Sequence, residues 1–254
     1  MQSFKKKLIH SKELIKESFG ILKRDKSLWA VPLLSFFSLL ILVPLIFVIS
    51  LPLLKFENEW IFAYVFLFLL IVYFVSTFFN AALTWMIWQV KQGKDATIGE
   101  GIRRALKNIL DVLLFSITTL IVSMLAAMIR GGRRQEGLGG LGREVGASTL
   151  ETSWNVLGSL VMPAMIIPEH HYFEAWAEVK EYRKTIPQVL VGHFGLGIIF
   201  SLAMVVAVLI MIGISLASPL AGLVVFVALI VPLIILNLLV RTTYFTLLYV
   251  YIKK

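Results

Sequence analysis

The chain has 254 residues, of which 59% are hydrophobic and only 15% are charged, and its mean hydropathy is +0.88. This composition excludes an ordinary soluble domain and is typical of an integral membrane protein. The absence of cysteine excludes disulfides, thiolate metal sites and cysteine nucleophiles. We therefore expect one integral membrane domain over residues 1–254, an all-α polytopic bundle, because helices satisfy their own backbone hydrogen bonds in lipid.

Long apolar stretches predict about six transmembrane helices. A helix needs roughly 20 apolar residues to cross a hydrocarbon layer about 30 Å thick. The fourth stretch is short and contains Asn155 and Pro163, so it is either a full span or a re-entrant segment. In chain order, the predicted spans cover residues 28–54, 60–90, 112–129, 150–167, 189–217 and 219–252.

The distribution of lysine and arginine predicts that both termini are cytoplasmic. With the N-terminus inside, most of the basic residues next to span ends fall on the cytoplasmic side. The exception is a glycine- and arginine-rich stretch, residues 130–149, which we expect to be an external loop. The net charge of +9 thus reflects topology and attraction to anionic headgroups. No basic soluble module is present that would bind a nucleic acid.

Three amphipathic segments, near residues 1–27, 97–109 and 172–186, each precede an outward span and are expected to be interfacial helices on the cytoplasmic face. We expect residues 1–27 to be such a helix and not a cleavable signal. Each segment contains an acidic, a small and a bulky residue in sequence: Glu17-Ser18-Phe19, Glu100-Gly101-Ile102 and Glu174-Ala175-Trp176. Such a triplet also arises by chance, so the prediction of a threefold pseudo-repeat rests on the shared order of interfacial helix, outward span and return span.

Five polar residues fall toward the cytoplasmic boundary of the predicted spans and form a candidate polar cluster: Asn80, Asp111, His193, Asn237 and Arg241. Polar groups at membrane depth are costly unless they are paired, so a contact between Asp111 and Arg241 is one hypothesis. The other, which we favour at this boundary position, is that these two side chains reach water separately, by snorkelling.

A candidate interfacial cluster follows the fourth span and consists of Glu169, His170, His171 and Glu174. Adjacent histidines on a helix point about 100° apart and do not converge easily on one ion. No second histidine-rich segment supplies further ligands. We therefore predict no metal and no cofactor here, and an interfacial or proton-sensitive role instead.

The fifth span contains small residues at four-residue spacing, among them Gly197 with Ser201 and Gly213 with Ala217. Small residues at this spacing let helices approach closely in membranes. We therefore expect the fifth span to be the most buried helix.

Residues 11–35 resemble the opening of an uncharacterised family of prokaryotic multi-pass membrane proteins. That opening carries a Ser-Trp-x-Leu pattern, then Ser, Leu and Asp-Lys, and then a Pro-Leu-Leu-Ser span entry. The matching residues here are Ser11, Leu14, Ser18, Leu22, Asp25, Lys26 and Pro32 to Ser35, while Lys12 replaces the tryptophan. A second likeness covers Ser153-Trp154 to Pro163 and Pro168-Glu169. The resemblance implies a prokaryotic plasma membrane location and brings no activity with it.

These observations favour a nonenzymatic membrane protein that organises partners or lipids. Its expected partners are membrane lipids and either further copies of itself or another membrane protein. The second hypothesis is a carrier or channel-like transporter of a small or amphiphilic solute, with the polar cluster lining a cytoplasmic vestibule. The third is an enzyme that acts on lipid headgroups through the interfacial cluster.

Overall fold

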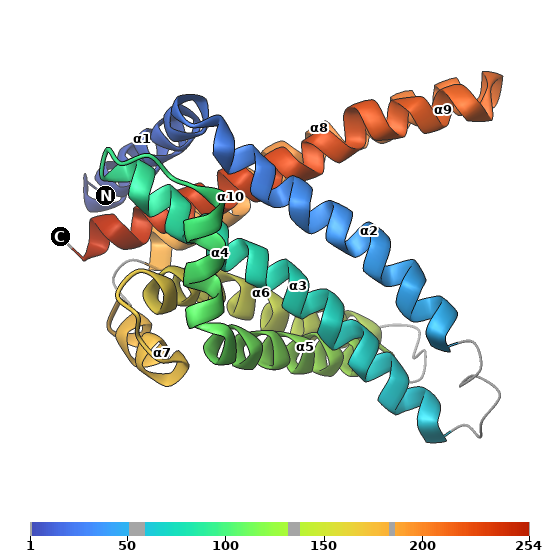
Figure 1. The fold of residues 1–254 in the computed structure, drawn as a ribbon, viewed down its shortest axis with the longest axis horizontal. Coiled ribbons are helices and arrows are strands. Elements are labelled where there is room, and N and C mark those ends of the chain that lie inside the picture. The colour runs from blue at the N-terminus through green and yellow to red at the C-terminus, as the bar shows by residue number, and fades with distance from the viewer. Residues whose placement is uncertain (1, 51–58, 132–137, 183–185, 254) are drawn as a thin grey trace.

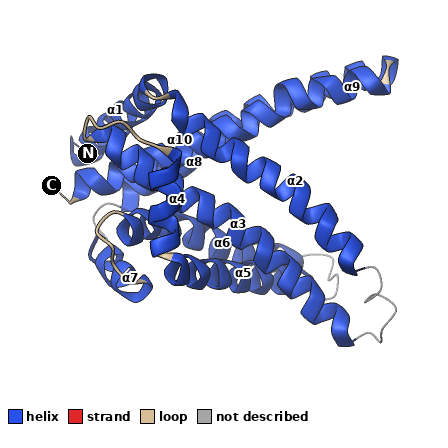
Figure 2. Cartoon of the chain, in the orientation of Figure 1, coloured by secondary structure: helices blue, strands red, loops and turns tan. Residues whose placement is uncertain are grey.

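The computed structural model describes residues 2–50, 59–131, 138–182 and 186–253. Within these ranges the secondary structure is helical, with short connections between the helices (Figure 2). The all-α prediction is therefore confirmed for the described residues. Six helical runs form three hairpins, each with an outgoing and a return helix, and a further helix precedes each hairpin. This order of a preceding helix and a hairpin occurs three times along the described part of the chain.

The three helices that precede the hairpins gather at the end of the molecule where the first and last described residues also lie (Figure 1). We call them the collar helices: α1 (Gln2–Arg24), α4 (Ile98–Lys107) and α7 (Tyr172–Glu181). A 3₁₀ turn, η1 (Lys26–Trp29), joins α1 to the first hairpin. The start of α4 is fixed by Thr97, whose hydroxyl accepts a hydrogen bond from the Glu100 backbone N–H at 3.3 Å.

The outgoing helices are α2 (Ala30–Ser50), α5 (Ile109–Gly131) and α8 (Ile186–Ala217). The return helices are α3 (Glu59–Lys91), α6 (Leu138–Ile166) and the continuous run of α9 (Pro219–Val225), the π-helical segment η4 (Phe226–Ile230) and α10 (Val231–Ile252). The predicted spans coincide with these helices except at the start of the fourth. Residues 51–54 of the first predicted span lie outside the described ranges.

Five helical segments in the described part of the chain are long and apolar enough to cross a membrane, which makes this a multi-pass membrane protein. They are Lys26–Ile49, Ile61–Lys91, Ile109–Gly131, His193–Leu216 and Pro219–Ile252. The helix α6, with 29 residues, is comparable in length to these five segments but is more polar, because it carries Glu144, Glu151 and Asn155.

The predicted external loop over residues 130–149 is wrong for most of its length. The structure places residues 130–131 in α5 and residues 138–149 in α6, and residues 132–137 lie outside the described ranges. The reason is a set of contacts between the two helices. Arg130 of α5 pairs with Glu144 at 3.5 Å and donates to Glu151 Oε1 at 2.8 Å. Between these two acids, Ala147 is fully buried, so the first half of α6 is held beside α5.

The contacts between hairpins follow a cyclic pattern. Each collar helix packs against a return helix of another hairpin: α4 on α3, α7 on α6, and α1 on the last return helix, α10. Each outgoing helix contacts the same return helix as the collar helix that precedes it: α5 contacts α3, α8 contacts α6 and α2 contacts α10. The return helices α3, α6 and α10 also contact one another pairwise, so they form the centre of the molecule.

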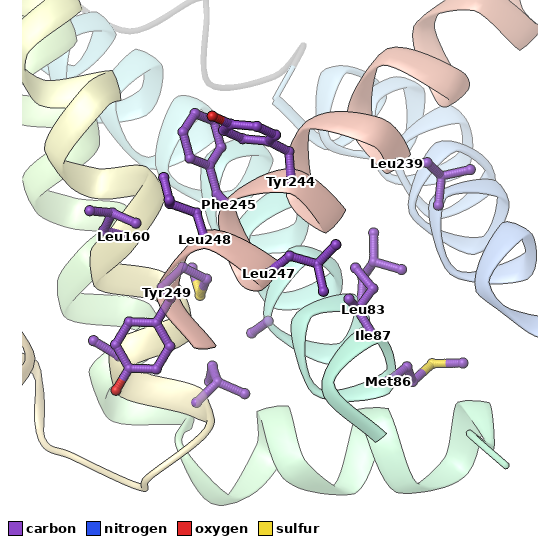
Figure 3. Packing of buried hydrophobic residues seen from close by; sticks show 14 of the residues in the cluster. Leu83, Met86, Ile87, Leu160, Leu239, Tyr244, Phe245, Leu247, Leu248 and Tyr249 are labelled. Atoms are coloured by element: carbon purple, nitrogen blue, oxygen red, sulfur yellow. The ribbon is translucent and has the colours of Figure 1, made fainter. Parts of the chain in front are cut away.

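The apolar core lies where the C-terminal halves of these three return helices meet, next to the collar (Figure 3). Leu83, Met86 and Ile87 of α3 are fully buried, as are Tyr244 and Tyr249 of α10. The bulky side chains anchor the three helices at this end. The opposite ends are less tightly held, and Figure 1 shows the hairpin of α8 and α9 extending away from the other hairpins.

The prediction that α8 is the most buried helix is wrong. A side chain added at Gly197 or Gly213 would meet open space, and large apolar side chains such as Ile198 and Leu202 are exposed. Small residues permit close packing, but they bury a helix only where a partner helix is present.

Candidate functional site

One polar residue on each return helix lies at the same distance from the collar end. Asn80, Asn155 and Arg241 each stand eleven residues before the last residue of α3, α6 and α10, respectively. With the rise of an α-helix, this places all three about 16 Å from those helix ends. They therefore come to a common depth near the middle of the bundle.

A cavity of about 240 Å³ lies between α3, α5, α6 and α10 at this depth. Most of its lining groups are amides, hydroxyls and aromatic rings, with a single arginine. The lining residues are Asn80, Thr84, Phe115, Thr119, Trp154, Asn155, Gly158, Ser159, Met162, Pro163, Leu238, Arg241, Thr242, Phe245 and Thr246. We call this the Arg241 pocket. Such a polar lining is unusual among helices whose surfaces are otherwise apolar.

Two hydrogen bonds between helices shape the pocket wall. Thr242 of α10 donates to Asn80 Oδ1 of α3 at 2.9 Å, and Trp154 Nε1 of α6 donates to the Thr119 hydroxyl of α5 at 3.1 Å. The Asn80 Nδ2 group and the whole Asn155 carboxamide have no hydrogen-bond partner among the described residues. Asn155 is also exposed. These groups can therefore donate to a ligand.

Arg241 supplies the charge of the pocket. Its guanidinium contacts Nδ1 of His193 on α8, and this contact needs a neutral imidazole that accepts the hydrogen bond. None of the carboxylates in the described residues forms an ion pair with Arg241. A guanidinium has five N–H donors in a planar fork that matches phosphate and carboxylate groups. The pocket therefore combines a cation with neutral donors and is suited to an anion.

The sequence from α3 onward shows which family the chain belongs to. The model of a family of unknown function, DUF6159, matches residues 59–253, which include every helix from α3 to α10. The chain belongs to this family. No curated protein and no solved structure matches the chain.

The DUF6159 match includes the second resemblance found in the sequence, at residues 153–169, and does not include the first, at residues 11–35. All residues of the Arg241 pocket lie within the matched range.

The polar cluster predicted from the sequence of this DUF6159 protein is only partly assembled. Asn80 and Arg241 line the pocket, and His193 reaches it through Arg241. Asn237 lies one turn before Arg241 and is not part of the lining. Asp111 is the third residue of α5, so it lies at the collar end and not at the depth of Arg241. The predicted contact between Asp111 and Arg241 is therefore wrong.

Asp111 instead binds the start of α7. Its Oδ1 accepts a hydrogen bond from the Tyr172 backbone N–H at 2.9 Å, and its Oδ2 lies 3.4 Å from His171 Nδ1. Glu174 accepts a hydrogen bond from the His171 backbone N–H at 3.0 Å. Asp111 thus helps to hold the collar helix α7 at the start of α5.

The predicted interfacial cluster does not converge on one point. Glu169 pairs with Arg104 and Lys107 of α4, whereas His170 contacts Glu178 at 2.9 Å and His171 faces Asp111. Among the described residues, no group of three or more histidines and carboxylates is placed to hold a metal ion. These side chains bind neighbouring elements of the collar to one another.

Each collar helix is also bonded to the end of the return helix in its own hairpin. Glu17 of α1 pairs with Lys91 of α3. Arg104 of α4 donates through Nε to the Ile166 carbonyl of α6 at 2.8 Å. In the third hairpin, Glu178 of α7 lies 3.1 Å from Lys253, which follows α10. The collar therefore links all three hairpins.

Sequence reasoning missed Glu178, which is the most heavily bonded carboxylate of the collar. It accepts hydrogen bonds from Tyr182 at 2.6 Å and from Tyr249 at 3.0 Å, in addition to Lys253 and His170. Burial raises the pKa of Glu178, but the hydrogen bonds from Tyr182, Lys253 and Tyr249 outweigh it and hold this pKa below its usual value. Tyr249 and Lys253 are 71 and 75 positions away in the chain, so no local pattern marks these two partners.

In each predicted triplet of an acidic, a small and a bulky residue, the small residue is buried. Ser18 and Ala175 are completely buried, and Gly101 is buried against α3. A Cβ atom at Gly101 would lie 2.9 Å from the Ala82 carbonyl oxygen, which is too close. The bulky partner Phe19 is exposed, whereas Ile102 and Trp176 are partly buried. The small residue therefore sets the approach of each collar helix.

Proposed function

We propose that this DUF6159 member is a nonenzymatic membrane protein that binds an anionic lipid, with the headgroup held in the Arg241 pocket. The observation that carries the proposal is the guanidinium of Arg241 inside a spanning helix, without a carboxylate partner among the described residues. An arginine at this depth is costly unless it is paired or faces a polar cavity. A phosphate or carboxylate headgroup would supply the missing charge.

The proposal includes a topology of six crossings, in which α6 adds one span to the five apolar ones. Two observations support it. The first and last described residues lie at the same end of the molecule (Figure 1), which requires an even number of crossings. In addition, α6 has 29 residues, which corresponds to about 44 Å of helix, more than the hydrocarbon thickness. The charge distribution supports cytoplasmic termini, and the resemblance of residues 11–35 to a prokaryotic family supports a prokaryotic plasma membrane.

We also propose that the three units of collar helix, outgoing helix and return helix form a threefold pseudo-repeat about the membrane normal. The cyclic contacts support this, because each collar helix contacts the return helix of its neighbour and bonds to its own. The repeat brings the three return helices together at the centre, where the pocket lies.

A lipid fits the pocket better than a soluble anion because the opening faces the hydrocarbon. Asn155 and Leu238 line the pocket and are exposed on the surface of the spanning helices. The apolar rings of Phe115 and Phe245 complete the wall. A polar headgroup in this pocket would find hydrogen-bond donors and a positive charge, while its acyl chains remained in apolar surroundings. The described lining residues include no acid, which supports binding over acid–base chemistry.

Binding of phosphatidylglycerol to the purified protein in detergent tests the proposal, with phosphatidylcholine as the zwitterionic comparison. Removing a charge-assisted hydrogen bond costs about 1.5–3 kcal/mol, so we expect Arg241→Gln to weaken phosphatidylglycerol binding about tenfold or more. Arg241→Lys keeps the charge and should retain part of the affinity. The control is Arg103→Gln, at an exposed position of α4. Equal affinity for wild type and Arg241→Gln would overturn the proposal.

A further inference from the structure

The helix α6 carries a row of polar side chains that leads out of the Arg241 pocket. Ser148, Thr152, Asn155 and Ser159 follow one another at spacings of four, three and four residues, which places them on one face of the helix. Asn155 and Ser159 belong to the pocket wall. Asn155 is exposed, and the other three are partly exposed. We call this row the α6 stripe.

Two residues of the α6 stripe lack partners in the protein. The side chains of Thr152 and Asn155 form no hydrogen bond with any described residue. An unsatisfied polar group in hydrocarbon is costly, so a polar group exposed at membrane depth implies contact with water or with a headgroup. The stripe is therefore a hydrated or headgroup-lined path on the surface of the bundle.

The surface of α8 differs from the α6 stripe. Most of the exposed side chains of α8 are large and apolar, as with Ile198, Leu202 and Leu209, and Ser201 interrupts them. This is the ordinary surface of a helix that faces acyl chains. On α6, four polar residues instead follow one another along one face.

The α6 stripe and the Arg241 pocket together extend over roughly half of the bilayer. From Ser148 to Ser159 the helix rises about 16 Å, compared with a hydrocarbon thickness of about 30 Å. Arg241 lies beside the middle of this path, at the depth of Asn155. Near the outer end, Arg130 and Glu151 form the ion pair between α5 and α6.

We infer that the protein lets anionic lipids cross between the two leaflets, with the headgroup moving along the α6 stripe past Arg241 while the acyl chains stay in the bilayer. The inference rests on the proposed binding of an anionic lipid. A headgroup crosses pure hydrocarbon slowly because it must leave water. Polar side chains at each turn from Ser148 to Ser159, and the guanidinium of Arg241 beside them, replace that water. The movement is passive and needs no chemical step.

A dithionite bleaching assay tests the inference. The purified protein is reconstituted into phosphatidylglycerol and phosphatidylethanolamine vesicles that contain headgroup-labelled NBD-phosphatidylglycerol, which dithionite quenches only in the outer leaflet. With wild-type protein we expect bleaching to continue beyond the outer-leaflet fraction that protein-free vesicles show. We expect the double substitution Thr152→Leu with Asn155→Leu to slow this second phase about tenfold or more, from the loss of two polar contacts.

The matched control is Ser201→Leu, which places the same side chain at an exposed position of α8 outside the stripe and should leave the rate unchanged. If the double variant does not fold, the near-isosteric Thr152→Val provides the test, with a smaller slowing expected. Three results would overturn the inference: bleaching that stops at the outer-leaflet fraction, a rate that the stripe variants do not change, or equal slowing by Ser201→Leu. If wild type shows Arg241-dependent binding but no second phase, the inference fails and the proposed function stands. If binding is absent, the proposed function fails.

Discussion

The hydroxyl of Thr242 donates a hydrogen bond to Asn80 Oδ1 at 2.9 Å, and this bond joins the first return helix to the last across 162 positions of the sequence. It lies on the wall of the Arg241 pocket. Both residues are therefore part of the structure that holds α3 and α10 together and of the surface that a ligand would meet.

Thr242→Val should destabilise the protein by about 0.6–1 kcal/mol, the usual value of a hydrogen bond between membrane helices. The control is Thr243→Val, because the buried Thr243 hydroxyl bonds to the Leu239 carbonyl of its own helix at 2.7 Å. Unfolding in detergent mixtures measures both changes. An equal loss at the two positions would show that the bond between helices contributes nothing beyond an intrahelical one.

Gly101→Ala should destabilise the protein by about 1–3 kcal/mol, because the new Cβ atom would meet the backbone of Ala82 and overpack the contact between α4 and α3. Gly99→Ala, in the same helix, has open space around it and should be neutral or stabilise by up to about 1 kcal/mol. Thermal unfolding of the two variants gives the comparison. If both changes had the same sign, the close approach of the collar helix would not matter for stability.

Glu178 makes the stability of the collar depend on pH. Since its pKa in the folded state is lowered, its contribution is complete above the unfolded-state pKa of about 4.3 and is lost as the pH falls through the lower folded-state value. We therefore expect Glu178→Gln to destabilise the protein at neutral pH and to have less effect in strong acid. The thermal midpoint between pH 7 and pH 3 measures this, as the difference from wild type. Glu181→Gln, at an exposed position of α7, is the control and should show no such trend.

The absence of cysteine makes the topology directly testable, since single cysteines can be introduced without removing others. We expect Lys94→Cys and Phe173→Cys to be labelled from the cytoplasm and Val145→Cys and Ser218→Cys from outside. Phe173 and Val145 are both exposed; Val145 lies in the first half of α6, and Phe173 lies in α7, which follows the other end of α6. Labelling of these two from the same side would show that α6 does not cross the membrane.

Hydrophobic length was sufficient to predict the five apolar segments that are long enough to cross a membrane, because lipid requires long apolar segments whatever the packing. It failed at the start of α6, where glycines and charges indicate a loop. There the helix is supported by Arg130, which binds Glu144 and Glu151 of α6, and such contacts between helices leave no local signal. Length and polarity alone could not distinguish an external loop from a helix at the start of α6.

The candidate site was predicted in part for a similar reason. Polar residues in apolar spans, such as Asn80 and Arg241, stand out in the sequence because hydrocarbon makes them costly. Their partners do not stand out, since Thr242 and Trp154 are ordinary residues of membrane helices. The pairing of Asp111 with Arg241 failed because depth along a helix depends on where that helix begins, and α5 begins only two residues before Asp111.

The position of a bound headgroup is the most direct measurement. In a cryo-electron microscopy map of the protein in nanodiscs that contain phosphatidylglycerol, we predict a phosphate about 3 Å from the Arg241 guanidinium, with Asn155 beside it. A map with water or an acyl chain in the Arg241 pocket, and with Arg241 still on His193, would contradict the proposed function.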